Sequence, residues 1–209
     1  ATHWLVTARD AAGRLRLALV SPGAAGVQRR ELPLADGAWA AELAFDGTPV
    51  QAVLGEGDIT EALGWAQDST TLATGAEAVG VMERLMADTA EHLRQRRQFG
   101  VPLASFQVLQ HRLADMHLAL VQAAALVGAT AEALTGLAPA RQRAVAAAQV
   151  MVALAARSVG QGAVQLHGGM GMTDELAVGH AFKRLTLIEQ QGGPLGHHLR
   201  QVAKHADAA

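Results

Sequence analysis

The chain has 209 residues and a formal net charge of −2, and half of its residues are hydrophobic although only 3% are aromatic. The nearly balanced charge excludes broad electrostatic binding to nucleic acid or to an anionic membrane. No cysteine is present, which excludes disulfides and thiolate chemistry and fits a cytoplasmic location. The nine histidines show no HExxH-type spacing, so we expect no metal site. Without an uninterrupted apolar run of about 18 residues, the sequence predicts no membrane span.

The first part of the chain, residues 1–55, predicts β-structure. Residues 3–7, 14–20 and 38–45 carry alternating or apolar runs, and Asp, Gly and Pro residues typical of turns separate them. About four strands fit into this length, which is too few for a closed sheet. We therefore expect residues 1–55 to be the C-terminal portion of an antiparallel β-domain, and the chain to be the C-terminal piece of a longer protein.

The rest of the chain, residues 56–209, predicts a helical bundle domain. Asp58 is a plausible capping residue for a long helix at about 59–98. A second helix is expected to start near Pro102, and apolar residues at intervals of three and four place one hydrophobic face along it. That face carries Phe106, Leu109, Leu113, Met116 and Leu120.

Three further helices complete the predicted bundle. Gly136 ends the second helix and Pro139 opens a third, followed by two shorter helices at roughly 174–190 and 195–206. The inner face of the third helix carries Val145, Val152, Ala156 and Val159. The predicted fold class is therefore mainly α, with an antiparallel four-helix-type bundle preceded by a partial antiparallel β-domain.

A glycine-rich segment, Gln165-Leu-His-Gly-Gly-Met-Gly171, separates the third helix from the next, which we expect to offer its N-terminus from Thr173. Glycines let backbone N–H groups approach a ligand closely, and a helix N-terminus adds unpaired donors. An anion such as a diphosphate suits this environment. A glycine-rich stop between two helices is by itself more often a turn, so the segment gains weight from a second motif upstream.

That second motif is Arg96-Arg-Gln-Phe-Gly100, followed by Ser105-Phe-Gln107 and then by Leu113-Ala-Asp-Met116. This pattern resembles the central signature of acyl-CoA dehydrogenases. The glycine-rich segment matches the same family's Gln-x-x-Gly-Gly-x-Gly, and the basic pair after it is matched by Lys183 and Arg184. The two motifs stand in the family's order and separation, and the resemblance covers essentially all of residues 1–205.

The resemblance implies an FAD site shared between subunits. The residues that it assigns to cofactor binding are Arg96, Gln98, Phe99, Gln107, Gln165, Gly168 and Gly169. Arg96 would hold diphosphate oxygens and Phe99 would stack on the adenine edge, while the glycine turn would contact the adenosine half. In the family these residues largely contact the FAD of a neighbouring subunit, which implies a homo- or hetero-oligomer, a dimer or a tetramer. The strands that hold the flavin would lie upstream of Ala1, so we expect residues 1–209 alone to lack FAD and activity.

The family's reaction needs a carboxylate base. The α-proton leaves an acyl-CoA thioester while hydride leaves the β-carbon for flavin, and an electron-transfer protein then accepts the electrons. In many members the base is a Glu in the turn before the last helix, a position that falls on Gly192, or on Gly193 after a one-residue slip. In other members it lies on the first long helix, at about Thr70, which is not acidic either.

Nearby titratable residues do not replace the missing base in the sequence. Asp68 lies two residues before Thr70 and would point to another helix face. Glu189 lies about one turn before Gly192, where an exposed surface Glu is the ordinary interpretation. The adjacent His197 and His198 could supply a base or contact CoA, but two neighbouring histidines near a helix start more often face solvent, which is what we expect. We therefore leave the catalytic residues unassigned.

Two functions from different classes remain open. The first is an acyl-CoA dehydrogenase with a displaced base, similar to subclasses that act on bulky or dicarboxylic acyl-CoAs and include small subunits of heteromeric enzymes. The second is a non-catalytic partner subunit that lends Arg96, Phe99 and the glycine turn to the FAD of a catalytic neighbour. A helical scaffold without flavin is a weaker third alternative. The missing carboxylate is the feature that discriminates the first two.

Overall fold

The computed structural model describes residues 1–205, and residues 206–209 lie outside the described part. The last residue of the helix expected at 195–206, and the end of the domain expected at 56–209, are among the residues left out. The chain divides into two compact units, Ala1–Ala66 and Gln67–Ala209. The division falls within the first long helix, α1 (Thr60–Gln95).

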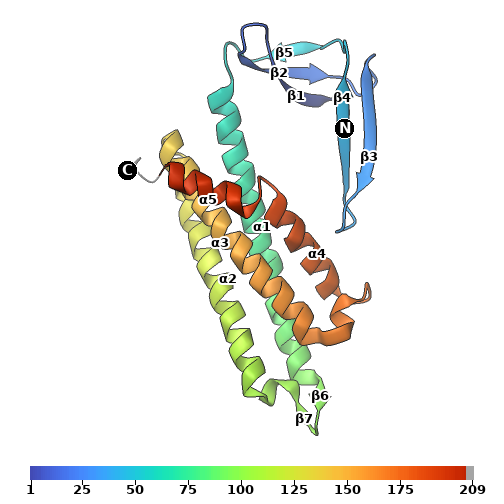
Figure 1. Cartoon of the computed structure of the whole chain (residues 1–209), viewed down its shortest axis with the longest axis vertical. Coiled ribbons are helices and arrows are strands. Elements are labelled where there is room, and N and C mark those ends of the chain that lie inside the picture. The colour runs from blue at the N-terminus through green and yellow to red at the C-terminus, as the bar shows by residue number, and fades with distance from the viewer. Residues whose placement is uncertain (206–209) are drawn as a thin grey trace. The chain divides into compact units, whose positions relative to one another are not determined.

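The first unit contains five strands (Figure 1). β1 (Trp4–Arg9), β2 (Leu15–Val20) and β5 (Ala52–Leu54) form an antiparallel sheet in the order β1-β2-β5. β3 (Val27–Pro33) and β4 (Trp39–Phe45) form a separate antiparallel pair. The sequence predicted β1, β2 and β4 but missed β3 and β5. The central residues of β3 are charged and exposed, and β5 is only three residues long, so neither shows a clear hydrophobic alternation.

The second unit is a helical bundle, as the sequence predicted (Figure 1). Its helices are the continuation of α1, then α2 (Gln107–Ala133), α3 (Ala138–His167), α4 (Ala177–Gln190) and α5 (Leu195–Lys204). A short connection joins α2 to α3, so these two long helices run antiparallel. The predicted fold class is confirmed: the chain is mainly α, and a few antiparallel strands precede an antiparallel helical bundle in the sequence.

One hydrophobic core joins α1, α2, α3 and α4. Met82, Met116, Val152 and Ile188, one from each helix, have at most 2% of their surface exposed. The predicted inner face of α3 is confirmed, and so is that of α2 from Leu109 to Leu120, because these apolar residues are buried or pack against this core. Phe106 precedes α2 and is not among the core residues. Burying a Met or Val side chain completely contributes about 1.5–3 kcal/mol, so this core stabilises the frame that carries the site.

The structure corrects the helix boundaries at two places. α1 ends at Gln95, three residues before the expected end, and β6 (Arg97–Gln98), β7 (Val101–Pro102) and a 3-10 turn, η1 (Leu103–Ser105), precede α2. Pro102 has an extended backbone, so α2 does not start there. A second 3-10 turn, η2 (Gly168–Met172), lies between α3 and α4.

The helix N-terminus expected at Thr173 is also wrong. α4 starts at Ala177, and Thr173 is extended, with its hydroxyl donating a 2.9 Å hydrogen bond to the carbonyl oxygen of Met170. Asp and Ser or Thr residues favour such local turns as well as helix starts, and here the turn prevails. Any anion near the glycine motif therefore meets the end of α3 and η2, and not the start of a helix at Thr173.

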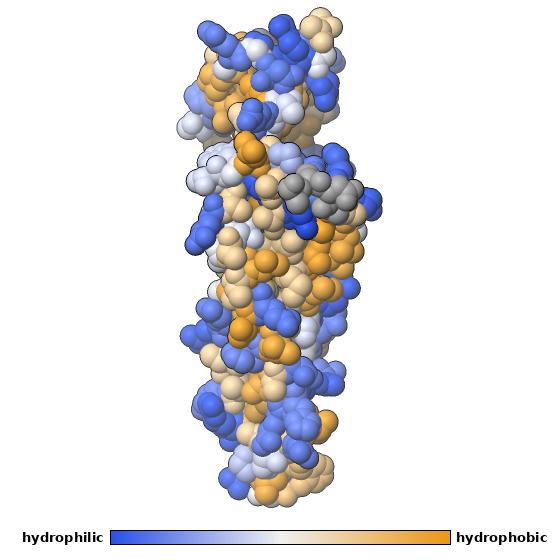
Figure 2. All heavy atoms as spheres, turned by 90° about the vertical axis from the view of Figure 1, so that its left-hand side faces the viewer, coloured by the Kyte–Doolittle hydropathy of each residue, from blue (hydrophilic) through white to orange (hydrophobic). Residues whose placement is uncertain are grey.

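Two helical segments, α2 and Ala138–Met172, are long and apolar enough to cross a bilayer by length and composition alone. In the first, 28% of the apolar window is buried inside the bundle, and in the second 56%. Figure 2 shows hydrophilic side chains spread among hydrophobic ones along the bundle face turned to the viewer. Core helices of a bundle meet the same length criterion, so support for a membrane span is weak, and its absence stays a prediction.

Candidate functional site

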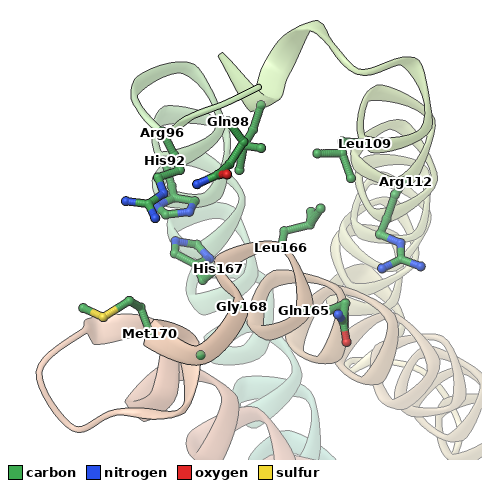
Figure 3. A pocket seen from close by; sticks show the side chains of 12 residues that line it. His92, Arg96, Gln98, Leu109, Arg112, Gln165, Leu166, His167, Gly168 and Met170 are labelled. Carbon is green, nitrogen blue, oxygen red and sulfur yellow. The ribbon is translucent and has the colours of Figure 1, made fainter. Parts of the chain in front are cut away.

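The two motifs meet at one end of the bundle, in a pocket of about 720 Å³ (Figure 3). The residues around it are His92, Arg96, Gln98, Leu103, Leu109, Arg112, Gln165, Leu166, His167, Gly168, Gly169 and Met170. Five of the seven residues assigned to cofactor binding are in this set, namely Arg96, Gln98, Gln165, Gly168 and Gly169. Segments that lie about 70 residues apart in the chain therefore form one site.

Arg96 is held at the pocket by the sharp turn that follows α1. Its N–H donates a 2.9 Å hydrogen bond to the carbonyl oxygen of His92, which continues the helical pattern by one residue. Its own carbonyl oxygen accepts a 2.8 Å hydrogen bond from the N–H of Leu103, where the β6–β7 hairpin returns. The backbone of Arg96 is thus fixed on both sides, while its side chain stays exposed.

Phe99 and Gln107 do not line the pocket. Phe99 lies at the tip of the β6–β7 hairpin with a positive φ of 53°, and 90% of its surface is exposed. Its ring meets that of Phe106 edge-on, at a centroid distance of 6.2 Å. Gln107 is the exposed first residue of α2. Their roles in cofactor binding therefore stay predictions, and both side chains are accessible to a second subunit.

The glycine motif forms the pocket wall at the end of α3. Gly168 ends the helix with φ 64°, a left-handed conformation that strongly favours glycine. A Cβ built on Gly168 or on Gly169 would meet no atom within 4 Å, so the backbone here borders open space. A ligand can therefore approach the main chain without a side chain in the way.

The pocket is basic, with no acidic side chain around it. Within residues 1–205, the guanidinium groups of Arg96 and Arg112 form no ion pair or hydrogen bond. A guanidinium without a carboxylate partner keeps its donors for a ligand oxygen. No group of three or more His, Asp and Glu side chains in that described range is placed to hold a metal ion. The arrangement suits a phosphate-bearing organic anion.

Two histidines that the sequence did not single out complete the basic side of the pocket. The rings of His92 and His167 stack at a centroid distance of 4.2 Å, with 27° between their planes. Burial lowers the pKa of His92, and the charges of His167 and Arg96 lower it further. The signal for His92 was its helical spacing, four residues before Arg96, and the signal for His167 was its place inside the glycine motif.

The turn between α4 and α5 is the second place of interest, because the resemblance predicts the usual position of the base there. Gly192 and Gly193 have φ values of 74° and 119°. A Cβ on Gly192 would lie 3.0 Å from the Oγ1 of Thr71, so this turn lies against α1 beside Thr70. The N–H of Gly193 donates to the carbonyl oxygen of Gln190 at 3.2 Å. Gly192 thus adjoins the residue after Thr70, and none of Gly192, Gly193 and Thr70 carries a carboxylate.

The acidic residues nearest to these positions are held in ion pairs. Asp68 accepts a 2.7 Å hydrogen bond from the Nε of Arg141 on α3. Glu189 has only 9% of its surface exposed and pairs with Arg157. The expectation of an exposed Glu189 is therefore wrong, because the residue lies on the face of α4 that packs against α3.

The histidine pair of α5 also differs from expectation. His198 is buried and His197 is half-buried, so the prediction that both face solvent is wrong. Burial lowers the pKa of His198, and the charge of His197 acts in the same direction, while a backbone hydrogen bond with Gly193 opposes both. His197 packs over Gly193, where a Cβ would lie 2.8 Å from its ring. These contacts fasten the start of α5 to the glycine turn.

The basic pair after the glycine motif is tied to neighbouring acids. Lys183 donates a 2.8 Å hydrogen bond to Asp174. Arg184 holds both carboxylate oxygens of Glu77 on α1, at 2.6 and 2.8 Å. Bidentate pairing of this kind adds geometric specificity, so this pair stabilises the packing of α4 within the bundle.

Comparison with known proteins shows the family of this chain. The family model described as acyl-CoA dehydrogenase, C-terminal domain, matches residues 63–206. The chain belongs to the acyl-CoA dehydrogenase family. The match begins near the start of α1 and includes every residue around the pocket.

Several relatives in this family come from Mycobacterium tuberculosis. Acyl-CoA dehydrogenase FadE27 is 31% identical over 198 residues, which cover 89% of this chain and 52% of that protein. Acyl-CoA dehydrogenase IpdE2 is 36% identical over 117 residues, which cover 56% of this chain and 35% of that protein. The crystal structure of the ChsE4-ChsE5 complex superposes with a TM-score of 0.88 and 28% identity, covering all of this chain and 56% of that one. The chain thus spans a third to about half of these relatives' length.

Proposed function

We propose that this chain is the C-terminal region of a flavin-dependent acyl-CoA dehydrogenase, which removes two hydrogens from the α- and β-carbons of an acyl-CoA thioester. The observation that carries the proposal is the basic pocket, where Arg96 and the glycine turn at Gly168 meet without an acidic neighbour. Family membership supports the same reaction class.

The pocket fits the adenosine diphosphate half of FAD. Arg96 and Arg112 have free guanidinium donors for the diphosphate oxygens, and the open main chain at Gly168 and Gly169 lets the ligand approach closely. Phe99 offers an exposed ring on which an adenine edge can stack. When bound, FAD supplies the oxidant that accepts the hydride from the β-carbon.

Exposed apolar groups support an oligomer. Phe99 is 90% exposed at its hairpin tip, and Leu118, Val121 and Leu154 are each about half exposed on α2 and α3. A neighbouring subunit that covers these side chains would remove apolar surface from water and place its flavin beside the pocket. The related ChsE4-ChsE5 structure is a complex of two proteins. We propose a homo- or hetero-oligomer that passes its electrons to an acceptor protein.

A second candidate is a non-catalytic partner subunit that completes the FAD site of a catalytic neighbour. The observation that favours it is the absence of a carboxylate at Gly192, Gly193 and Thr70. Asp68 and Glu189 are paired with arginines, which leaves neither poised to accept an α-proton. In this role the chain would bind FAD without carrying out proton abstraction.

Flavin bleaching distinguishes the two candidates. The protein that carries this chain is purified by itself, and also together with a paralogous dehydrogenase chain that has the Glu base. Each preparation is titrated anaerobically with a panel of acyl-CoA thioesters while the absorbance of oxidised flavin is followed. We expect bleaching in the joint preparation. Rapid bleaching of the protein by itself would refute the partner role, and no bleaching in either preparation would refute the enzyme function.

A further inference from the structure

The stacked His92 and His167 rings lie on the same side of the pocket as Arg96, whereas Arg112 lies on the opposite side (Figure 3). His92 comes from the last turns of α1 and His167 from the last residue of α3. The two rings thus bring titratable nitrogens from two helices to the wall where an anion would meet Arg96. Histidine is the side chain whose charge changes most readily near neutral pH.

Hydrogen bonding leaves proton sites on this pair available. The Nδ1 of His167 lies 2.9 Å from the carbonyl oxygen of Ala163, and a carbonyl can only accept, so Nδ1 carries a proton. The Nε2 of His167 is then the ring nitrogen that can accept a hydrogen bond in the neutral tautomer. Within residues 1–205, the His92 ring has no hydrogen-bond partner. A neutral His92 ring offers a bound oxygen atom one N–H donor, and protonation adds a second donor and a positive charge, which strengthens the hydrogen bond to an anion.

The pocket disfavours protonation of His92 while it holds no anion. The groups that face His92 are His167 from α3, Arg96 at the end of α1 and Arg112 from α2 across the pocket. On α1 itself, Asp88 is paired with Arg84. Burial and the nearby positive charges lower the pKa of His92, so the free pocket keeps this ring neutral at neutral pH.

We propose that the His92–His167 pair is the proton-coupled part of this pocket, and that the pair takes up a proton from solvent when a diphosphate-bearing ligand binds. The inference rests on the proposed function, because it concerns the same nucleotide site. The negative charge of the ligand offsets the repulsion from Arg96, and the protonated ring donates a charge-assisted hydrogen bond to a phosphate oxygen. Two stacked imidazolium rings repel each other, so the pair takes up one proton and not two.

Proton uptake makes the affinity depend on pH. The bound ligand can raise the pKa of His92 by about one unit. The dissociation constant is then up to about tenfold lower at pH values below both pKa values of His92, free and bound, than at pH values above both. Affinity is then higher at about pH 6 than at about pH 8, and holding the nucleotide becomes more favourable as the medium acidifies.

The test uses ADP-ribose, the adenosine diphosphate half of FAD without the flavin, because its diphosphate keeps a constant charge near neutral pH. The dissociation constant is measured calorimetrically for the protein that carries this chain, in its full assembly and freed of FAD, at about pH 6 and about pH 8, in buffers of different ionisation enthalpy that reveal proton uptake. The pKa of the His92 ring is followed by NMR with and without the ligand. We expect about three- to tenfold tighter binding at the lower pH, close to one proton taken up, and a rise in the pKa of His92.

Two variants locate the effect. His92→Gln should bind with little pH dependence and no proton uptake, and His167→Gln should reduce both. His117→Gln, at an exposed position of α2 away from the pocket, should behave like wild type. ADP-ribose binding with equal affinity at both pH values would overturn the inference and leave the proposed function intact. No binding at either pH would overturn the nucleotide site and the inference together.

Discussion

Gly192, in the turn between α4 and α5, lies against Thr71 of α1, so that a Cβ on Gly192 would be 3.0 Å from the Oγ1 of Thr71. Thr71 directly follows Thr70, the position on α1 at which the resemblance would place a base in some members. Gly192 also has φ 74°, which a residue with a Cβ adopts only with strain. The backbone conformation of the turn thus disfavours any residue with a side chain at position 192, including one with a carboxylate.

We therefore predict that Gly192→Glu does not simply restore a base. The left-handed conformation and the close Thr71 hydroxyl should lower the free energy of unfolding by about 1–2 kcal/mol. Ala73→Glu is the matched variant, because Ala73 is exposed on the regular helix α1, and it should change stability by less than about 0.5 kcal/mol. Urea unfolding of both variants measures the difference. Equal stability of the two would show that the turn accommodates a side chain.

Removal of either partner of the Asp68–Arg141 ion pair should lower the free energy of unfolding strongly. The two side chains have 14% and 6% of their surface exposed, so removal of one partner leaves a nearly buried charge. Asp68→Asn and Arg141→Met should each lower the free energy of unfolding by about 3–5 kcal/mol. The double variant should lose less than the sum of the two, as measured in a double-mutant cycle. Additive losses would mean that the two groups are not coupled.

The bundle should lose stability on mild acidification. His92 and His198 both have a lowered pKa, so the unfolded chain binds protons more readily than the folded chain below about pH 6.5. Where the unfolded state holds more protons, stability rises with pH and falls as pH drops. We predict a smaller free energy of unfolding at about pH 5.5 than at about pH 7.5, a range in which exposed carboxylates stay ionised.

Urea unfolding at the two pH values checks this prediction. His92→Gln should weaken the pH dependence, because one of the two destabilising protonations is removed. His117→Gln, which changes an exposed histidine of α2, should not. Stability that is equal or greater at the lower pH would contradict the direction of both shifts.

The sequence predicted the parts of this structure that depend on local pattern. The apolar seam from Phe106 to Leu120 located α2, and the punctuation at Gly136 and Pro139 located the turn into α3. Five of the residues that the two motifs assigned to cofactor binding line one pocket. That the two motifs meet there is visible only in the folded structure. Long helices with regular spacing leave few alternatives, which is why this much follows from the chain alone.

What the sequence did not reveal depends on contacts between distant segments. The burial of Glu189 depends on Arg157 of the neighbouring helix, and the burial of His198 depends on how α5 packs on α3. The stack of His92 and His167 depends on which turn of α1 meets the end of α3. The start of α4 was misplaced because Thr173 and its neighbours favour a turn and a helix cap equally well.

The most direct test of the FAD site is the retention of flavin by the Arg96→Ala variant of the protein that carries this chain, purified as its full assembly. Loss of a charge-assisted hydrogen bond to phosphate typically costs about 1.5–3 kcal/mol, so FAD affinity should fall roughly ten- to hundredfold. Arg94→Ala is the matched control, because Arg94 is exposed near the end of the same helix, pairs with Glu91 and does not line the pocket. Flavin content is measured after dialysis. We predict loss of FAD from Arg96→Ala and full retention by Arg94→Ala, whereas unchanged flavin content in Arg96→Ala would remove this pocket from the FAD site.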